Sequence, residues 1–448
     1  MGGGPTGHAM LDAARAALGE PPLPPDTTGV SAMPGLGGPL PVDELACGAV
    51  LAQLLAARRL NGGRGPVELD ARHVGFAFRS ERHVRLDGVP AGAGFAPWSR
   101  FWRTADGWLR LHANYPHHER AARLVLGEGS PDAVAAAMPA EQLEAAVVAA
   151  GGAAAAVRSP DEWARHPQGA TVARLPLLSL TRVADAPARA VPPSGPRVLD
   201  LTRVIAGPVA TRTLAAHGAD VLRVDSPHLP ELPGALLDTG PGKRHTLLDL
   251  AASSDRGILE ELLRAADVLA LGYRPGALDA HGLGAAALAA RHPHLVVVRL
   301  SAWGTTGPWR HRRGFDSLVQ AATGIATAYG DDERPGVLPA QALDHGTGHL
   351  AAAVALTALA RRRDEGGTWH GELSLAQTAH WLTASGVRAT TAAEPAGDVT
   401  PYLVTLPSPL GRVTVVAPPG APAWVRGPVP AGHDRPQWEP AAQEGEPA

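Results

Sequence analysis

The 448-residue sequence is poor in several residue types, and each shortage narrows its possible functions. A single cysteine, Cys47, excludes an intrachain disulfide and a cysteine-based zinc site, and is typical of the reducing cytoplasm. No run of about 18 uncharged apolar residues is present, so we expect no membrane association. Lys and Arg total 40 against 43 Asp and Glu, with no basic stripe, which argues against a nucleic-acid partner.

The basic and aromatic residues that are present show a strong bias. Lys243 is the only lysine, so arginine supplies the other fixed positive charges, and the 10 Trp outnumber the 4 Tyr and 5 Phe together. This bias indicates a GC-rich bacterial genome. With 45% hydrophobic residues, the chain can bury at least one large core, and its length fits about two or three domains.

The first part of the chain predicts a flexible segment followed by a smaller domain. Residues 1–39 carry many glycines and prolines, which break regular structure, so we expect a flexible N-terminal segment. Residues 186–196 are rich in proline, which is typical of a linker. Between them, residues 40–185 predict a smaller α+β domain with a helix over 42–60, a strand and helix over 67–78, a hairpin over 101–111 and alanine-rich helices on both sides of Met138-Pro139.

The second part predicts an α/β domain. Apolar strands over 197–201, 220–224, 267–271 and 295–300 alternate with helices over 208–217, 254–265 and 284–291. Strands that are apolar throughout favour a parallel sheet covered by helices, so residues 197–395 should form a doubly wound, mostly parallel, Rossmann-like sheet. Residues 396–448 are expected to form a return segment with two strands and, after Trp424, an increasingly disordered proline-rich tail.

An internal repeat connects the two parts. Asp43 lies at the start of an Ala/Leu helix that ends with an Arg pair and is followed by glycines and the tripeptide Val-Glu-Leu. Asp344 lies at the start of a second such helix, which is again followed by arginines, glycines and Gly-Glu-Leu. We interpret this repeat as a partial duplication.

Common cofactor and metal motifs are weak or absent. Residues 282–287 spell GxGxxA but do not follow a strand, and no Walker loop, GxSxG elbow or HExxH is present. Two loops are better candidates. Residues 199–208, LDLTRVIAGP, lead into a helix N-terminus that either holds an anion or only forms a tight turn. Lys243-Arg244 lies in a glycine-flanked loop, which hints at a phosphate or carboxylate partner.

Together these segments resemble the class III CoA-transferase family, which includes formyl-CoA and carnitine CoA-transferases and α-methylacyl-CoA racemase. The resemblance is strongest over residues 198–382. It rests on LDLTRVIAGP, GADV at 218–221, Lys243-Arg244 with LDL at 248–250, ADV to YRPG over 266–276, GTTGP at 304–308, GFD at 314–316 and Leu343-Asp344. FWRTADG at 101–107 and SPDEW at 159–163 resemble the family's small domain, which here precedes the large one.

The resemblance implies an activity and a site. Asp344 matches the family's nucleophile, which attacks an acyl-CoA thioester to give a mixed anhydride and free CoA. A carboxylate at a helix start beside Gly346 and Gly348 has backbone N–H groups nearby and room for the thioester. An N-cap role is the structural alternative for Asp344, and it is the interpretation we prefer for Asp43. The implied CoA contacts are Ile205, Ala206, Lys243, Arg244, Leu248, Tyr273, Arg274, Arg313 and Phe315.

Several positions depart from the family pattern. Ile205, Ser226 and Ala280 stand where formyl-CoA transferases have a glutamine and two arginines, and residues 91–94 are a thin candidate for their glycine-rich lid. Phe315 stands where the racemase branch has a histidine, and phenylalanine cannot move a proton.

We therefore expect an acyl-CoA:carboxylate CoA-transferase first, a catalytically weakened CoA-binding or partner subunit second, and a 2-methylacyl-CoA racemase third. Acyl-CoA and a carboxylic acid are the expected partners, with coenzyme A as substrate, no permanently bound cofactor and no metal. The family's interlocked subunits also suggest a homodimer, which could be intertwined.

Overall fold

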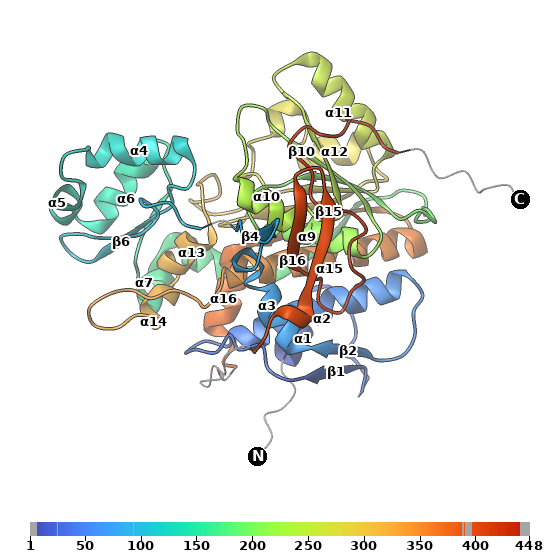
Figure 1. Ribbon diagram of the computed structural model, residues 1–448, viewed down its shortest axis with the longest axis horizontal. Helices are drawn as coiled ribbons and strands as arrows, with labels where there is room; N and C mark the ends of the chain where they lie inside the picture. Colours follow the sequence, from blue (N-terminus) through green and yellow to red (C-terminus); the bar gives the residue numbers. More distant parts are fainter. Residues whose placement is uncertain (1–6, 25, 93, 388, 390–396, 440–448) are drawn as a thin grey trace, which may run out of the picture.

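A seven-stranded sheet forms the centre of the protein (Figure 1). The computed structural model describes residues 7–24, 26–92, 94–387, 389 and 397–439. The strands lie in the order β11 (Lys243–Leu247), β10 (Asp220–Asp225), β9 (Arg197–Leu201), β12 (Val268–Leu271), β13 (Val296–Ser301), β14 (Thr368–Ser374) and β8 (Leu178–Ala184). All neighbours are parallel except β8, which pairs antiparallel with β14. The expected mostly parallel α/β sheet is confirmed.

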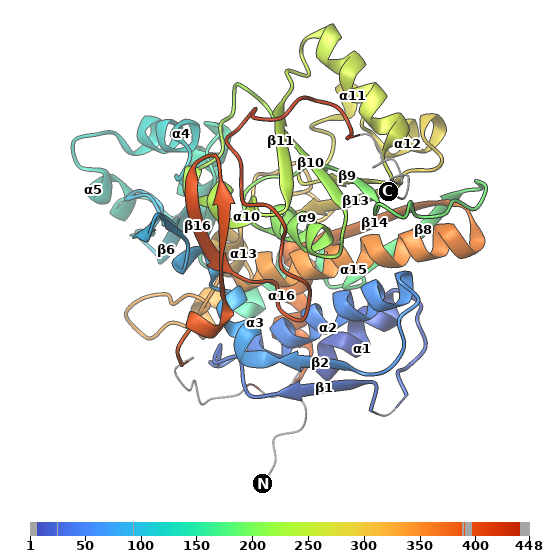
Figure 2. The same ribbon diagram turned by 45° about the vertical axis from the view of Figure 1, so that its right-hand side comes forward.

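Helices cover both faces of this sheet, as expected for a doubly wound fold (Figure 2). Alternate residues of each strand point to opposite faces. Val198 and Val268 therefore join the core beneath α9 (Ala206–Ala216) and α15 (Ala342–Glu365), whereas Leu199 and Leu269 join the core beneath α11 (Ser253–Ala265) and α12 (Ala285–Arg291). Burial on both faces explains why these strands are apolar throughout.

The described part of the N-terminal segment, residues 7–24 and 26–39, is packed on the rest of the protein, which differs from the expected flexible segment. Helix α1 (His8–Ala17) and strand β1 (Thr28–Ser31) lie within it. Met10 and Leu11 of α1 are almost fully buried in the main core. Glycines and prolines at 19–39 only shorten these elements, because a few well-placed apolar side chains are enough to attach them.

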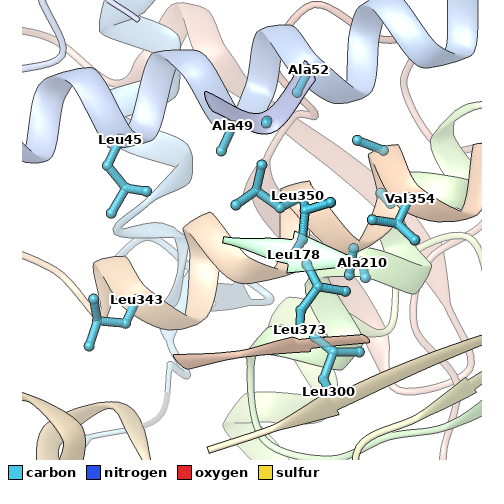
Figure 3. Packing of buried hydrophobic residues seen from close by; sticks show 14 of the residues in the cluster. Leu45, Ala49, Ala52, Leu178, Ala210, Leu300, Leu343, Leu350, Val354 and Leu373 are labelled. Carbon is cyan, nitrogen blue, oxygen red and sulfur yellow. The ribbon is translucent and has the colours of Figure 1, made fainter. Parts of the chain in front are cut away.

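Helix α2 (Val42–Leu60) packs directly on α15 rather than in a separate smaller domain (Figure 3). Leu45, Ala49 and Ala52 of α2 face the Leu343 to Val354 side of α15. Strand β8 also belongs to the large sheet, so residues 186–196 join two strands of one sheet. The structure therefore differs from the expected division at residue 186, because composition marks the proline-rich turn but not the partner of the strand before it.

A smaller α+β unit lies beside the main sheet, with its own core around Trp102, Leu109 and Leu143 (Figure 1). The expected hairpin is confirmed, and so are the helices around Met138-Pro139. The unit contains β5 (Phe101–Arg103), β6 (Trp108–Leu111), β7 (Ala154–Ala156), α4 (Pro116–Leu126), α5 (Pro131–Ala136) and α6 (Ala140–Ala149).

Short elements connect these bodies. They are β2 (Val67–Asp70), α3 (Ala71–Ala77), α7 (Pro160–Arg165), α8 (Pro167–Val172), α10 (Pro233–Thr239), α13 (Asp316–Ala322), α14 (Ile325–Ala328), α16 (Leu375–Ala384) and 3-10 turns at Ser80–Arg82, Asp279–His281 and Thr400–Tyr402. No helix in the described ranges is long and apolar enough to cross a bilayer.

The C-terminal segment stays packed well beyond Trp424. Strands β15 (Leu403–Ser408) and β16 (Gly411–Val416) form the expected return hairpin and pair with β3 (Arg85–Leu86) and β4 (Val89–Pro90). Trp424 Nε1 donates to Arg212 O at 2.8 Å, and Trp438 Nε1 donates to Leu262 O at 3.0 Å. The expected disorder is therefore wrong up to residue 439, because two indole rings anchor the proline-rich chain; residues 440–448 lie outside the described ranges, as do residues 390–396 of the expected α/β domain.

The internal repeat has a structural counterpart. Helix α2 connects the parallel strands β1 and β2, and α15 precedes β14, which is parallel to β13. The residues before the two helices, Pro41 and Gln341, have nearly the same backbone angles, φ −76° and ψ 59° against φ −75° and ψ 61°.

Candidate active site

A cavity of about 470 Å³ lies where loops from both parts of the chain meet the carboxyl ends of the parallel strands. The sheet order reverses between β9 and β12, and open α/β sheets bind ligands in the crevice at such a switch point. Val204 and Ile205 enter the cavity from the loop after β9, and Asp344 enters from the start of α15. Phe95 and His112 come from the first part of the chain.

Asp344 sits in the first turn of α15 and is 5% exposed, at the cavity wall. Its backbone N–H donates to Asp316 Oδ2 at 3.0 Å. Asp316 is in turn held by the Gln320 side-chain amide, whose Oε1 accepts from Leu338 N at 2.9 Å. The helix start is thus capped by Asp316, which leaves the Asp344 carboxyl group free to face the cavity.

Three carboxyl groups, those of Asp344, Asp316 and Glu81, line this wall. Burial, followed by the negative charges of Asp316 and Glu81, raises the pKa of Asp344 well above its usual range. Burial also raises the pKa of Asp316 to about 6. Burial opposes ionisation of Glu81 too, but the neighbouring His345 imidazole, 3.7 Å away, outweighs it and lowers the pKa of Glu81. Backbone N–H groups therefore do not keep Asp344 strongly ionised, in contrast to our expectation.

The two glycines beside Asp344 serve helix packing. A Cβ on Gly346 would lie 3.0 Å from Leu45 Cδ1 of α2, and one on Gly348 would lie 2.5 Å from the backbone oxygen of Ala206 in α9. Our expectation that they leave room for a thioester is wrong, because α2 and α9 occupy that space. Room in the cavity comes from the side away from these helices.

Phe315 lies against His112, with ring centroids 3.5 Å apart and planes 3° from parallel. His112 is fully enclosed, and burial, then His118, lowers its pKa well below the usual value. Its Nδ1 has no hydrogen-bond partner among the described residues. Trp108, Arg110 and His112 alternate along β6 and the residue after it, and this period of two could have placed His112 on the face of the hairpin toward the cavity.

The loop after β9 carries local strain at the cavity. Val204 has φ 70°, which is rare for a β-branched residue and costs roughly 1 to 3 kcal/mol. Its N–H donates to Glu231 Oε2 at 2.9 Å, which holds the strained turn. Ile205 lines the cavity, Ala206 begins α9, and Leu248 lies inside the second core instead.

Lys243 and Arg244 pair with carboxylates within the sheet, so neither side chain is free to bind a phosphate. Lys243 is 1% exposed, and its Nζ donates to Asp200 Oδ2, Thr211 Oγ1 and Pro208 O at 2.6 to 3.0 Å. Arg244 is 4% exposed and pairs with both oxygens of Asp220 at 2.8 and 2.9 Å. These positions do not support the expected CoA contacts, because each cation is already matched by a carboxylate.

Other cations are free to meet an anionic ligand near the cavity. Arg274 is exposed, and Arg313, two residues before Phe315, makes no ion pair within the described ranges. Burial and then the charge of Arg274 lower the pKa of Arg313, which places the two guanidinium groups close together. Tyr273 and Arg274 line a small cavity of about 30 Å³ after β12. This small cavity is separate from the Asp344 cavity, whose lining includes Phe315, two residues after Arg313.

The expected lid residues reach the cavity in part. Gly92, Gly94 and Phe95 line it, and Ala93 lies outside the described residues. Asn114 Oδ1 accepts from Ala96 N at 3.0 Å and from Ser99 Oγ at 2.5 Å, so the segment is tied to the hairpin.

The fold and site define an α/β protein with a carboxyl-lined, ligand-sized cavity at the carboxyl ends of parallel strands. Residues 194–401 match the model of CoA-transferase family III. The chain is 37% identical over 202 residues to an acetyl-coenzyme A transferase, nodX, of Hypoxylon pulicicidum, covering 43% of this chain and 34% of that protein. It is 33% identical over 214 residues to a probable fatty acyl-CoA transferase, Rv3272, of Mycobacterium tuberculosis, covering 45% and 53%.

A further relative is the beta subunit of a succinyl-CoA–L-malate CoA-transferase from Chloroflexus aurantiacus, 33% identical over 196 residues, covering 41% of this chain and 48% of that protein. A crystal structure of Rv3272 aligns with a TM-score of 0.41 and 33% identity over 45% of this chain and 58% of that one. The chain thus spans between 34% and 53% of the length of these curated relatives.

Proposed function

We propose that this chain is an acyl-CoA:carboxylate CoA-transferase in which Asp344 is the nucleophile. The observation that carries this proposal is the Asp344 carboxyl group at the wall of a cavity of about 470 Å³, within the part of the chain that matches CoA-transferase family III. The relatives named above are all described as CoA-transferases.

The reaction transfers CoA from a donor acyl group to an acceptor acid, through intermediates formed on the Asp344 carboxylate. The Asp344 carboxylate attacks the thioester carbonyl, the C–S bond breaks, and an acyl-aspartyl anhydride and CoA thiolate form. The thiolate then attacks the aspartyl carbonyl of the anhydride, releases the donor acid and leaves an aspartyl thioester. Attack by the acceptor carboxylate, followed by return of the thiolate to the acceptor acyl carbon, regenerates Asp344. No water and no oxidant enters the balance.

The residues around Asp344 control its charge. Burial and then the two neighbouring carboxyl groups raise the pKa of Asp344, so its ionisation needs a higher pH than that of an exposed aspartate. Asp316 holds the backbone of Asp344, so it positions the nucleophile as well as repelling its charge. Phe315 and His112 stack beside it as an apolar wall that excludes water from the anhydride.

The nucleotide part of CoA is assigned to Arg274 and Arg313. Arg274 lines the small cavity after β12, Arg313 lies two residues before Phe315 of the Asp344 cavity, and neither pairs with a carboxylate among the residues the structure describes. Lys243 and Arg244 have no such freedom. Both parts of the chain line the cavity, so one chain supplies a whole site and no exchange of segments within a dimer is needed.

Intact-mass analysis after incubation with acyl-CoA tests this function. Acetyl-CoA and succinyl-CoA are suitable first probes, and an adduct should map to the peptide with Asp344 and be cleaved by hydroxylamine. Asp344→Asn should remove the adduct while retaining CoA binding, and Asp43→Asn should keep it. CoA binding without adduct or exchange for any donor would instead assign a non-catalytic CoA-binding role.

A further inference from the structure

Arg110, in strand β6, is a buried cation without a carboxylate. Its side chain is 6% exposed, and its Nε has no hydrogen-bond partner. In the described ranges its guanidinium group forms no ion pair. The other buried arginines all pair with acids: Arg158 with Glu144, Arg212 with Asp238, Arg223 with Asp225, Arg244 with Asp220 and Arg362 with Asp267.

The groups facing Arg110 do not replace the missing anion. Phe95 and Phe101 lie under the guanidinium carbon at 4.7 and 5.0 Å from their ring centres, which offsets part of the desolvation cost. Asp316 raises the pKa of Arg110, but burial lowers it more, to about 10, so the group stays charged at neutral pH. The oxygens of Asp316 already accept from Gln320 and Asp344 N.

Arg110 lines a second open cavity, of about 680 Å³, between the β5–β6 hairpin and the loop at 329–337. Figure 1 shows this loop after α14, close to the small unit. Phe101, Trp108 and Tyr329 supply aromatic wall, and Arg100 and Arg334 add positive charge. Arg100 is already paired with Asp132 at 2.7 Å, and Asp331 is held by backbone N–H groups of its own turn. A carboxylate that approaches Arg110 would displace no ion pair among the described residues, because Asp331, which lines the cavity, does not pair with Arg110.

We propose that this cavity binds an organic acid with an aromatic or apolar body, whose carboxylate pairs with Arg110. A planar guanidinium group binds a carboxylate through two parallel hydrogen bonds. Phe95 contacts both Arg110 and His112, and His112 lines the Asp344 cavity, so the two cavities lie along one face of β6. The bound acid is either an acceptor substrate on its way to Asp344 or an effector beside it.

Calorimetric titration with phenylacetate and with its neutral analogue phenylacetamide tests the site without acyl-CoA. The wild-type chain should bind phenylacetate at least about tenfold more tightly than the amide, as expected for a charge-assisted pair worth about one factor of ten. Arg110→Met should abolish this preference. Arg165→Met, at an exposed arginine of α7, is the matched control and should keep it.

A second variant separates loss of phenylacetate binding from misfolding of the protein. Val337 is 52% exposed at the mouth of the cavity, so Val337→Trp should fill it without disturbing the fold and should weaken phenylacetate binding. Because Arg110 has no partner, the melting temperature of ligand-free Arg110→Met should equal or exceed that of the wild type. Equal binding of acid and amide, or unchanged binding in Arg110→Met, would overturn the proposal.

The proposal is separable from the proposed function. Asp344→Asn should bind phenylacetate as the wild type does, even if no CoA exchange is ever detected. In exchange assays, formation of phenylacetyl-CoA identifies the acid as an acceptor, and a changed rate with another acceptor identifies it as an effector. Either outcome requires Arg110.

Discussion

The helices α2 and α15 start in a similar way but lie in different surroundings. Each carries an aspartate in its first turn, Asp43 or Asp344, and the residues before them share their backbone angles. Asp43 is 2% exposed, and its Oδ1 accepts from Leu36 N at 2.8 Å. The next residue, Glu44, accepts from Gly7 N and Ala9 N at the start of α1. Asp344 faces a cavity.

The difference comes from what precedes each helix. A single strand, β1, and the loop at Leu36 precede α2, and they close over its start. Five parallel strands, β9 to β13, precede α15, and the segments that follow β9, β10 and β13 line the cavity. An aspartate at a helix start becomes a candidate nucleophile only where the sheet leaves space beside it.

Exchange kinetics would give the largest contrast between the two aspartates. Asp344→Asn should lower the CoA exchange rate by roughly 3 to 4 orders of magnitude, as removal of a covalent nucleophile does. Asp43→Asn should leave the rate within about threefold. This change keeps the shape of the side chain, and Asp43 is not among the residues that line the cavity, so no transition-state contact is removed. Similar losses of exchange rate in both variants would contradict the assignment of different roles to Asp344 and Asp43.

The sheet that distinguishes α15 depends on Lys243. Lys243→Met leaves the buried Asp200 carboxylate without its cation, which should lower the free energy of unfolding by about 3 to 5 kcal/mol in urea titration. The thermal shift produced by CoA should persist in this variant. Arg274→Gln should do the opposite, with little change in urea midpoint and a smaller CoA shift. If Lys243→Met lost CoA binding and Arg274→Gln did not, the CoA phosphate would instead be assigned to Lys243 in β11.

Alanine at the helix glycines probes how closely α2, α9 and α15 approach. Gly348→Ala places a Cβ 2.5 Å from a backbone oxygen, which cannot move cheaply, so we expect a loss of about 2 to 3 kcal/mol. Gly346→Ala meets only the end of the Leu45 side chain and should cost about 1 kcal/mol. Gly257→Ala in α11 meets nothing within 4 Å and should stabilise by about 0.5 to 1 kcal/mol.

The pH dependence should differ in sign between activity and stability. Since the pKa values of Asp344 and Asp316 are raised on folding, the native state binds more protons than the unfolded state above the unfolded value of 3.8. Their contribution to stability is therefore lost as pH rises, for Asp316 through about 6. The exchange rate should instead rise with pH as Asp344 ionises, at a higher pH than for an exposed aspartate.

Asp316→Asn sharpens this prediction. Removing one negative neighbour should move the apparent pKa of the exchange rate to lower pH, and Asp43→Asn should not move it. The measurement is the pH profile of kcat/KM for each variant. A profile unchanged by Asp316→Asn would mean that Asp344 does not set it.

Sequence patterns located most regular elements, because their signals are local. Apolar runs marked β9, β10, β12 and β13, and the Ala-Asp-Gly turn marked the β5–β6 hairpin within a residue or two. The motif around Asp344 also identified the residue that the structure places in the cavity. Lys243 was misassigned, because a lone lysine beside glycines has the same sequence signature whether it faces a phosphate or a buried aspartate.

The sequence by itself determined the strands, the helices and their apolar faces, since these depend on periodicity within a few residues. Only the tertiary structure decided which of two similar aspartates faces a cavity and which cations remain unpaired. Arg110 and Arg223 each lie between two apolar residues of a strand. Arg223 pairs with Asp225, whereas Arg110 contacts two phenylalanine rings and lines an open cavity. Burial and charge pairing depend on neighbours brought together from distant parts of the chain, so they have no local signature.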